Sequence, residues 1–421
     1  MLPLRRVRPF LTAFATTVAA CSGSTDIVTP PPPPATGLTL TFVPDSEDVA
    51  TARALGWQAG LPGLAVTVTP ADSSAGPRTF TSAADGTVRI PDLVGGKYVL
   101  EASRWLTAVE RAKLGAGDDG DGFATRAPFS ASAAGGAASV TVPASRRRSL
   151  VISEWAFNGN VVTGLGAYDF GGFLELYNNA DTTIYLDRIV VGEGFQIANN
   201  YPNSPCALYT QFTNDPSGVW TRFMERFPGN GHDHPLEPGT AVVVATDAID
   251  HRPLFPRTLD LRSADFEFTG PADVDNPAVP NMEDVGLIAH SDGHGLYWPG
   301  IARVAIVAAP VDVPNLRHVA FPPADGSATY AQIPRDRILD VLWLRPNFAE
   351  QTLAECPQLV NEAFDRAGAD MRGTDDFAEG EWSISRRVLP EQVAGRSVLQ
   401  HTRTGRADFL RTRRSPGTIA K

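Results

Sequence analysis

The sequence has few lysines, few cysteines and no long apolar run in its body. All but three of its 36 basic residues are arginine, the lysines being Lys97, Lys113 and Lys421. Its 47 acidic residues give a formal charge of −11, which disfavours binding to nucleic acid or to an anionic membrane surface. Beyond residue 20, no stretch approaches the ~18–20 uninterrupted apolar residues that a membrane-spanning helix needs. The composition therefore argues against a nucleic-acid-binding protein and against a spanning helix in the body of the chain.

Several catalytic motifs are also missing. The sequence has no G-x-S-x-G elbow, no Walker loop and no H-E-x-x-H, and no G-x-G-x-x-G follows a predicted strand.

Glu154 and Glu175 are expected to lie near one another on neighbouring strands, and paired carboxylates can hydrolyse glycosides. A packing role is the expectation for both acids, and we predict that the protein is not an enzyme.

The first residues have the form of a lipoprotein signal peptide. Arg5, Arg6 and Arg8 precede an apolar segment at residues 9–20, and Val18-Ala19-Ala20-Cys21 matches a bacterial lipobox. We expect residues 1–20 to be removed and Cys21 to carry the lipid; an ordinary signal peptide with a chance cysteine is the alternative. Residues 21–36 contain Pro30 to Pro34 and are expected to form a stiff tether.

The rest of the chain predicts a mainly β protein. Its 38 glycines and 35 prolines, spread without a period, are typical of many strands joined by loops. A chain of 421 residues is too long for one compact sandwich. We predict one β-sandwich at residues 37–145 with a brief helix at 105–114, and a second at 149–410 with long insertions. One short helix is expected within residues 333–367, from the apolar stripe Leu359, Val360, Ala363, Phe364 and Ala367.

Two stretches resemble known domains. The lamin-tail opening pattern, I-x-E, F-x-E-L-Y-N and I-x-L, is matched by Ile152, Glu154, Phe173, Glu175, Leu176, Tyr177, Asn178, Ile184 and Leu186. Residues 62–103 are similar to the prealbumin-like regulatory modules of carboxypeptidases and outer-membrane proteins. A family of bacterial lipoproteins of unknown function also carries such a module before a lamin-tail-like domain. Residues 248–268, 275–283 and 383–409 resemble that family. The resemblance implies immunoglobulin-like and prealbumin-like sandwiches without catalytic residues, acting beside an outer-membrane receptor.

Histidines and acids offer two candidate metal sites. A hydrolase with a metal held by His232, His234, His251, His290 and His294 is the alternative function, since imidazoles two or four apart can meet one ion. Both close pairs fall in glycine-rich turns, so surface histidines are the expectation. Asp118, Asp119 and Asp121 resemble a calcium loop, but position 12 is Phe129 rather than an acid. We therefore predict no resident metal and no cofactor.

Two cysteines remain if Cys21 is acylated. Cys206 and Cys356 would then be the only thiols of the chain, and they would lie in an oxidising compartment, where such pairs normally form a disulfide. Two buried free thiols are the alternative.

Two further segments carry surface hypotheses. Aromatic residues between 195 and 227 suit either a sugar-stacking surface or a loop folded over its own aromatic core: Phe195, Tyr201, Tyr209, Phe212, Trp220, Phe223 and Phe227. From Arg386 to Lys421 the chain has nine Lys/Arg against Glu391 and Asp408, and we expect this basic end, with residues 411–421 as its tail, to be solvated and partly mobile.

These observations favour a non-catalytic lipoprotein of the cell envelope. Its two sandwiches would present loops to a ligand, a protein or a glycan, and its lipid would hold it at a membrane, the outer membrane above all.

Overall fold

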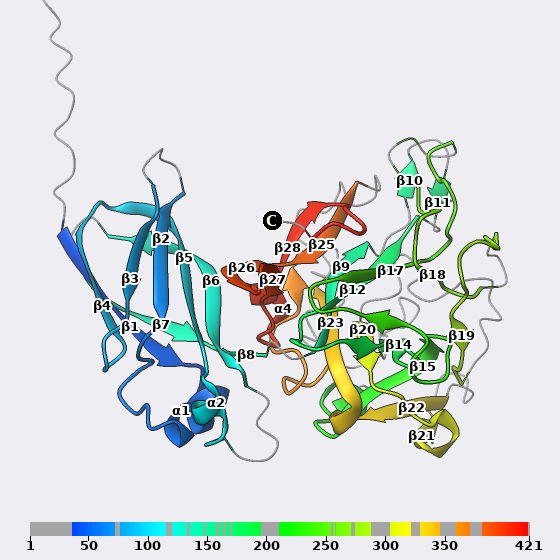
Figure 1. The fold of residues 1–421 in the computed structure, drawn as a ribbon, viewed down its shortest axis with the longest axis horizontal. Helices are drawn as coiled ribbons and strands as arrows, with labels where there is room; N and C mark the ends of the chain where they lie inside the picture. Colours follow the sequence, from blue (N-terminus) through cyan, green and yellow to red (C-terminus); the bar gives the residue numbers. More distant parts are fainter. Residues whose placement is uncertain are drawn as a thin grey trace, which may run out of the picture.

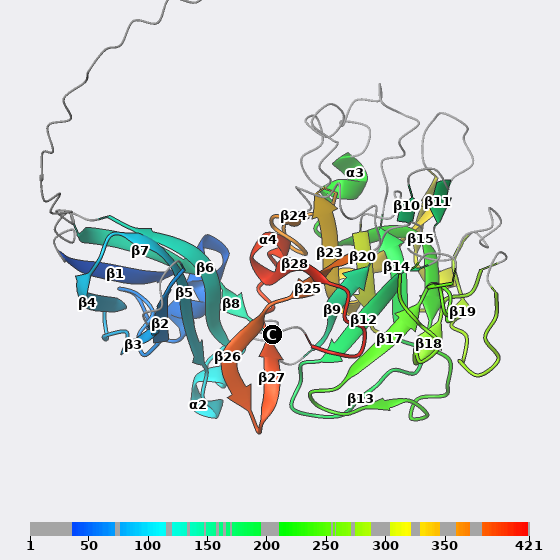
Figure 2. The same ribbon diagram turned by 90° about the horizontal axis from the view of Figure 1, so that it is seen from above.

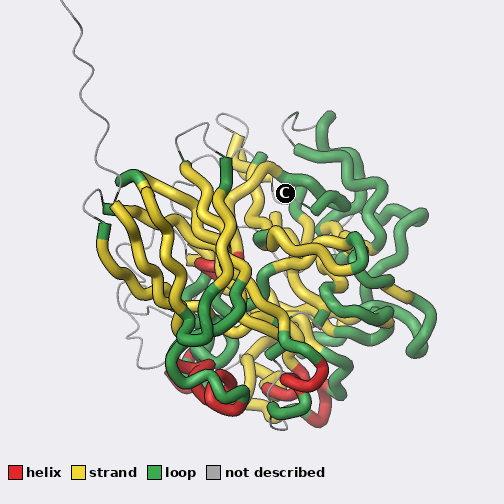
Figure 3. The backbone as a smooth tube through the Cα atoms, turned by 60° about the vertical axis from the view of Figure 1, so that its left-hand side comes forward, coloured by secondary structure: helices red, strands yellow, loops and turns green. Residues whose placement is uncertain are grey.

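The computed structural model describes two β-rich units. The described residues are 36–71, 76–114, 120–132, 135–146, 149–156, 160–162, 166–168, 171–194, 210–253, 256, 258–270, 274–287, 304–320, 329–345, 359–370 and 381–419. Figure 1 shows the first unit, residues 36–146, beside the second unit, residues 149–419. Figure 3 shows how little of the chain is helical, which confirms the mainly β class. Among the described residues, no helix is long and apolar enough to cross a membrane.

The first unit packs two sheets around one core. The three-stranded sheet has the order β4-β1-β7 and the five-stranded sheet the order β3-β2-β5-β6-β8. The elements are β1 (Thr36–Pro44), η1 (Ser46–Asp48), α1 (Val49–Ala54), β2 (Ala65–Pro70), β3 (Arg78–Thr81), β4 (Thr87–Leu93), β5 (Gly96–Trp105), α2 (Ala108–Arg111), β6 (Gly122–Ala131), β7 (Gly136–Val142) and β8 (Ala144–Ser145). A single cluster from Leu38 to Ala144 fills the space between them. The brief helix expected near residue 110 is α2, whose Thr107 and Glu110 form a capping box.

The second unit contains two larger sheets. A six-stranded sheet has the order β18-β17-β12-β9-β25-β28: β9 (Leu150–Ala156), β12 (Phe173–Asn178), β17 (Ala241–Ala245), β18 (Phe266–Glu267), β25 (Trp382–Arg386) and β28 (Phe409–Arg413). An eight-stranded sheet has the order β21-β22-β15-β14-β20-β23-β24, with β19 paired to β15: β14 (Val190–Gly194), β15 (Gly218–Arg226), β19 (Glu283–Asp284), β20 (Val304–Ala308), β21 (Arg317–Ala320), β22 (Thr329–Pro334), β23 (Ile338–Arg345) and β24 (Ala369–Asp370).

Short elements complete the second unit. They are the ribbons β10 (Asn160–Val162) with β11 (Gly166–Tyr168), β13 (Ile184–Tyr185) with β16 (Pro235–Leu236) and β26 (Val388–Val393) with β27 (Arg396–Leu399), and the helical turns α3 (Thr210–Thr213), η3 (Val313–Asn315), η4 (Arg335–Arg337) and α4 (Gly405–Asp408). Figure 2 shows the β26–β27 hairpin between the two units, next to β6 and α2.

Side-chain alternation explains how the two large sheets face each other. Leu174 and Leu176 of β12 lie in one cluster with Val191 of β14 and Val307 of β20, so this cluster is the core between the sheets. Glu175 lies between the two leucines in sequence and therefore faces the other side of β12. The expectation that Glu154 and Glu175 lie on neighbouring strands is confirmed by β9 and β12.

The helix expected within residues 333–367 is wrong for the described part of that range. β23 occupies residues 338–345, and residues 359–368 form turns. Asn361 Oδ1 accepts from Ala363 N at 2.9 Å, and Asp365 Oδ1 accepts from Ala367 N at 3.2 Å. Such side-chain bonds compete with the helical backbone ladder and favour turns. The apolar stripe is nevertheless buried, because Leu359, Val360 and Phe364 belong to the cluster on the outer face of β14 and β20.

The basic end also differs from its expectation as a solvated tail. Residues 409–413 are strand β28, paired with β25. Buried Arg414 donates from Nη1 to Gly171 O at 2.7 Å and from Nε to Trp382 O at 3.1 Å. We call residues 414–419 the closing segment, because they lie on the outer face of β9 and β12, where Ile419 packs against Val151 and Tyr177.

Candidate functional site: the cleft between the two units

Polar and apolar contacts join the two units. Arg366 of the second unit reaches η1 of the first, with Nη2 2.8 Å from Glu47 Oε2 and Nη1 3.2 Å from Asp45 Oδ1. The Arg366 side chain is only 11% exposed, so this contact is shielded more than an ordinary surface ion pair. Leu389 and Val398 of the β26–β27 hairpin pack against Ala124 of β6.

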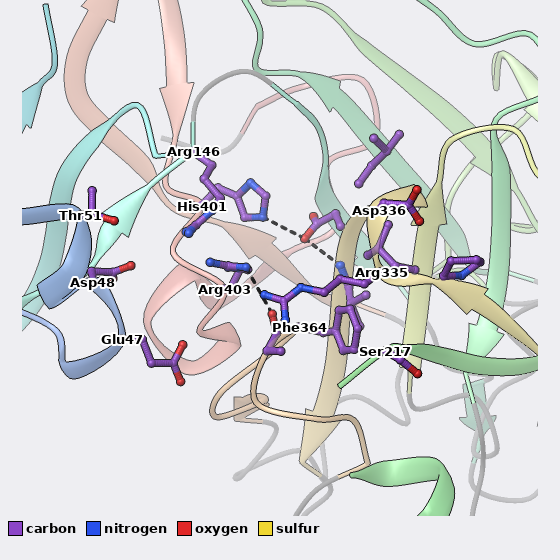
Figure 4. Close-up of a pocket in the computed structure, with 16 residues that line it drawn as sticks. Glu47, Asp48, Thr51, Arg146, Ser217, Arg335, Asp336, Phe364, His401 and Arg403 are labelled. Carbon is purple, nitrogen blue, oxygen red and sulfur yellow. Dashed lines mark hydrogen bonds and ion pairs between the residues drawn. The ribbon is translucent and has the colours of Figure 1, made fainter. Parts of the chain in front are cut away.

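A cleft of about 730 Å³ lies at this joint. The first unit contributes η1, the start of α1 and Arg146, and the second contributes the β22–β23 turn and the loops around residues 363 and 401. Figure 4 shows the charged side chains that line it from both sides. Arg146 N donates to His401 O at 3.0 Å, which ties the linker of the first unit to one wall of the cleft.

The innermost wall is a buried network around Asp340. Its Oδ2 accepts from Arg386 Nη2 at 2.5 Å and from Ile152 N at 2.8 Å, and its Oδ1 accepts from Val341 N at 2.9 Å. His401 Nε2 lies 3.4 Å from Oδ1. Burial alone would raise the pKa of Asp340, but the charge of Arg386 and the bond from His401 hold that pKa below its usual value. Asp340 is therefore ionised and fully occupied.

Arginine side chains line the opposite and outer walls. Arg403 Nη1 donates to Ala363 O at 3.3 Å, and Arg403 O accepts from Arg366 N at 2.9 Å. The Arg403 backbone has φ 56°, a left-handed conformation that is unfavourable for an arginine. Figure 4 shows Arg335 extending into the cleft toward Arg403.

The structure does not bring the predicted metal ligands together. His251 is buried with Nε2 2.9 Å from Asp247 O, and burial lowers its pKa. His232 meets Tyr185 edge to face and His234 meets Phe266 edge to face, with ring centroids 4.4 Å and 5.2 Å apart. In the described ranges, no three His, Cys, Asp or Glu side chains could hold a metal ion. The other predicted ligands, His290 and His294, lie outside those ranges. The hydrolase alternative therefore finds no support among the described histidines.

The structure does bring Glu154 and Glu175 together. They are register partners on β9 and β12, where a bulge leaves Ser153 as the extra residue. Glu154 accepts from Ser383 Oγ at 2.5 Å and from Ser415 N at 2.9 Å. Glu175 accepts from Ser153 Oγ at 2.6 Å and from Gly417 N at 2.7 Å.

Burial dominates the titration of this carboxylate pair. It raises the pKa of Glu154, and it raises the pKa of Glu175 to about 7 in spite of the bonds from Ser153 and Gly417. Both side chains are only 1% exposed beneath the closing segment. A substrate has no access to them, so their role in the fold is packing.

Other candidates are placed only in part. Phe212, Trp220 and Phe227 are buried, and the Phe212 and Trp220 rings meet edge to face at 5.4 Å, so the described aromatics form a core and not a sugar-stacking surface. Asp121 is buried, and its backbone bonds to Ser145 and Leu106, so it does not lie on an exposed calcium loop. The remaining candidates fall outside the described residues: Cys21, Cys206, Cys356, Asp118, Asp119, Phe195, Tyr201 and Tyr209.

Sequence reasoning missed the cleft itself. Asp340, Arg386 and His401 come from distant segments, and no spacing in the sequence relates them. One weak signal was present. Arg386 ends a strand whose other residues are short or apolar, and a charged residue in such a place is usually paired with an opposite charge.

The fold and the site define a two-unit β protein with a charged cleft at its joint. Residues 237–415 match the model of a family described as "Protein of unknown function (DUF4876)". The match confirms that the chain resembles a family of unknown function, as the sequence predicted. The crystal structure of a DUF4876 family protein from Bacteroides thetaiotaomicron VPI-5482 is similar, with a TM-score of 0.52 and 16% identity over 92% of this chain and 96% of that chain. At that identity the similarity concerns the fold alone. No curated protein matches the chain.

Proposed function

We propose that the protein is a non-catalytic, lipid-anchored component of the cell envelope that binds a ligand through the cleft between its two units. The observation that carries this proposal is the cleft itself, about 730 Å³ in volume and lined by both units. Cavities of this size at domain junctions are common sites for small molecules. The units that form it are held by Arg366 and by the β26–β27 hairpin, so the cleft is formed before a ligand arrives.

The anchor and the location follow from the sequence. The lipobox ending at Cys21 supports attachment to a membrane, and the proline run from Pro30 to Pro34 supports a spacer that keeps the cleft clear of the lipid. We place the protein at the outer membrane beside a receptor, with an envelope protein or a glycan as the macromolecular partner. The formal charge of −11 argues against nucleic acid.

Replacing the lipidated cysteine tests the anchor. In Cys21→Ala, we expect incorporation of labelled fatty acid to be lost and the protein to leave the detergent phase, because no thiol remains at the lipobox. Wild type carried through the same phase separation is the control. A substituted protein that still takes up lipid would refute the anchor.

Metal content tests the alternative function. One zinc per chain, lost in the double variant His232→Ala with His234→Ala, would favour the metal-dependent hydrolase over the non-catalytic protein.

A further inference from the structure

The carboxylates in the cleft wall are already occupied by the protein. Asp340 uses both oxygens for Arg386, two backbone N–H groups and His401. Asp48 Oδ2 accepts from Ala144 N at 2.7 Å and lies 3.6 Å from Arg366. Both acids are nearly inaccessible, at 3% and 4% exposure. They fix the walls and offer little to a ligand.

The accessible part of the lining is different. Arg335 is exposed at the cleft, and within the described ranges no side chain or carbonyl pairs with its guanidinium. Figure 4 shows this side chain and that of Arg403 reaching toward each other from opposite walls. Two guanidinium groups that converge repel each other unless an anion lies between them. A guanidinium also presents a planar fork of donors that matches a carboxylate or a phosphate.

The backbone at Arg403 supports the same conclusion. A left-handed conformation is better suited to glycine or asparagine, yet an arginine stands there. Its carbonyl bonds to Arg366 N, so the strained residue is linked directly to the joint between the units. The strained backbone is therefore held by the structure around it, at a residue whose cationic side chain lines the cleft.

From this geometry we propose that the cleft binds a small molecule bearing an oxyanion, a carboxylate or a phosphate, gripped between Arg335 and Arg403. This inference rests on the cleft being the binding site of the proposed function. Thr51 and Ser217 also line the cleft, and the Ser217 hydroxyl donates to Asp215 Oδ1 at 2.5 Å. Asp336 and Glu47 also line the cleft, so its rim carries charges of both signs.

Binding of simple anions to a soluble form without the lipidated cysteine, residues 22–421, tests the proposal. The probes are inorganic phosphate and pyrophosphate in one arm and citrate and succinate in the other, followed by calorimetry at fixed ionic strength. We expect one arm to bind, and Arg335→Gln to weaken that binding at least tenfold. Arg403→Asn should weaken it similarly, since asparagine tolerates the left-handed backbone. The arm that binds identifies the source as a phosphate or a carboxylate.

A neighbouring arginine supplies the matched control. Arg337 lies in the same η4 turn and is exposed, but it does not line the cleft, so Arg337→Gln should bind as wild type does. Equal losses in Arg335→Gln and Arg337→Gln would show general charge attraction and overturn the proposal, as would the absence of binding in both arms. Absence of anion binding would leave the lipid anchor of the proposed function standing if membrane partition still depends on Cys21. Loss of that dependence would refute the anchor.

Discussion

At the scale of single residues, Arg386 connects parts of the second unit that are far apart in sequence. Its guanidinium donates to Ile152 O at 2.7 Å, Gln400 O at 3.0 Å and Asp340 Oδ2 at 2.5 Å, and its Nη1 lies 3.4 Å from Asp408 Oδ2. The side chain is 1% exposed and lies 4.3 Å above the Phe409 ring. Each of the three guanidinium nitrogens has an acceptor, which is what a buried charge requires.

Removing this charge should be costly. We expect Arg386→Met to lower the free energy of unfolding by about 3–5 kcal/mol, because the buried carboxylates of Asp340 and Asp408 lose their cation. Urea denaturation measures the loss. Arg413→Met is the control, since Arg413 is 67% exposed where it pairs with Glu381, and such pairs contribute at most about 1 kcal/mol. Similar losses in the two variants would contradict the role assigned to Arg386.

At the scale of elements, the closing segment holds β9 and β12 through two acids. Ser415 bonds to Glu154, and Gly417 bonds to Glu175, whose pKa burial raises from 4.5 to about 7. Between pH 4.5 and about 7, the Glu175 carboxyl is more often protonated in the folded protein than in the unfolded chain. Stability from this group is therefore present below pH 4.5 and is lost as pH rises to about 7.

Glu175→Gln should remove that pH dependence. An amide can donate to Ser153 Oγ and accept from Gly417 N, so the contacts survive while the charge is gone. We expect the wild type to lose on the order of 3 kcal/mol more than the variant between pH 4.5 and pH 7, from urea midpoints at each pH. Glu283→Gln, at a 44% exposed carboxyl, is the control and should follow the wild type. Parallel curves for wild type and Glu175→Gln would refute the raised pKa.

The elements also show what the sequence could predict. The pairing of Glu154 with Glu175 was predictable, because both lie in short segments with the character of neighbouring strands. The stripe from Leu359 to Phe364 is buried but was wrongly expected to be helical, since Asn361 and Asp365 close turns instead. The cleft was not predictable, because His401 and Asp340 meet only through the order of strands in the sheets.

At the scale of the whole molecule, the segment around Asn214 contacts the segment around Asn361. Asn361 Nδ2 donates to Asn214 O at 3.0 Å and contacts Asn214 Oδ1 at 3.0 Å. Cys206 precedes the first of these segments in the sequence and Cys356 precedes the second, and their disulfide remains a prediction. We expect no free thiol in the denatured, unreduced chain from residue 22, and expect Cys206→Ser with Cys356→Ser to cost roughly 4–5 kcal/mol of stability. Two titratable thiols in the unreduced wild type would refute the bond.

The position of β9 in its sheet sets the order in which the chain assembles. Glu154 of β9 bonds to Ser383, 229 positions later, and to Ser415, 261 positions later, whereas Ser139 and Thr41 in the first unit are 98 positions apart. Contacts between distant positions form slowly, because a long loop must close before they contribute any free energy. We therefore expect the first unit to fold earlier than the second. We also expect Glu154 and Glu175 to stay hydrated until β25, β28 and the closing segment are in place, and the cleft to form only when both units have folded, since residues of both line it.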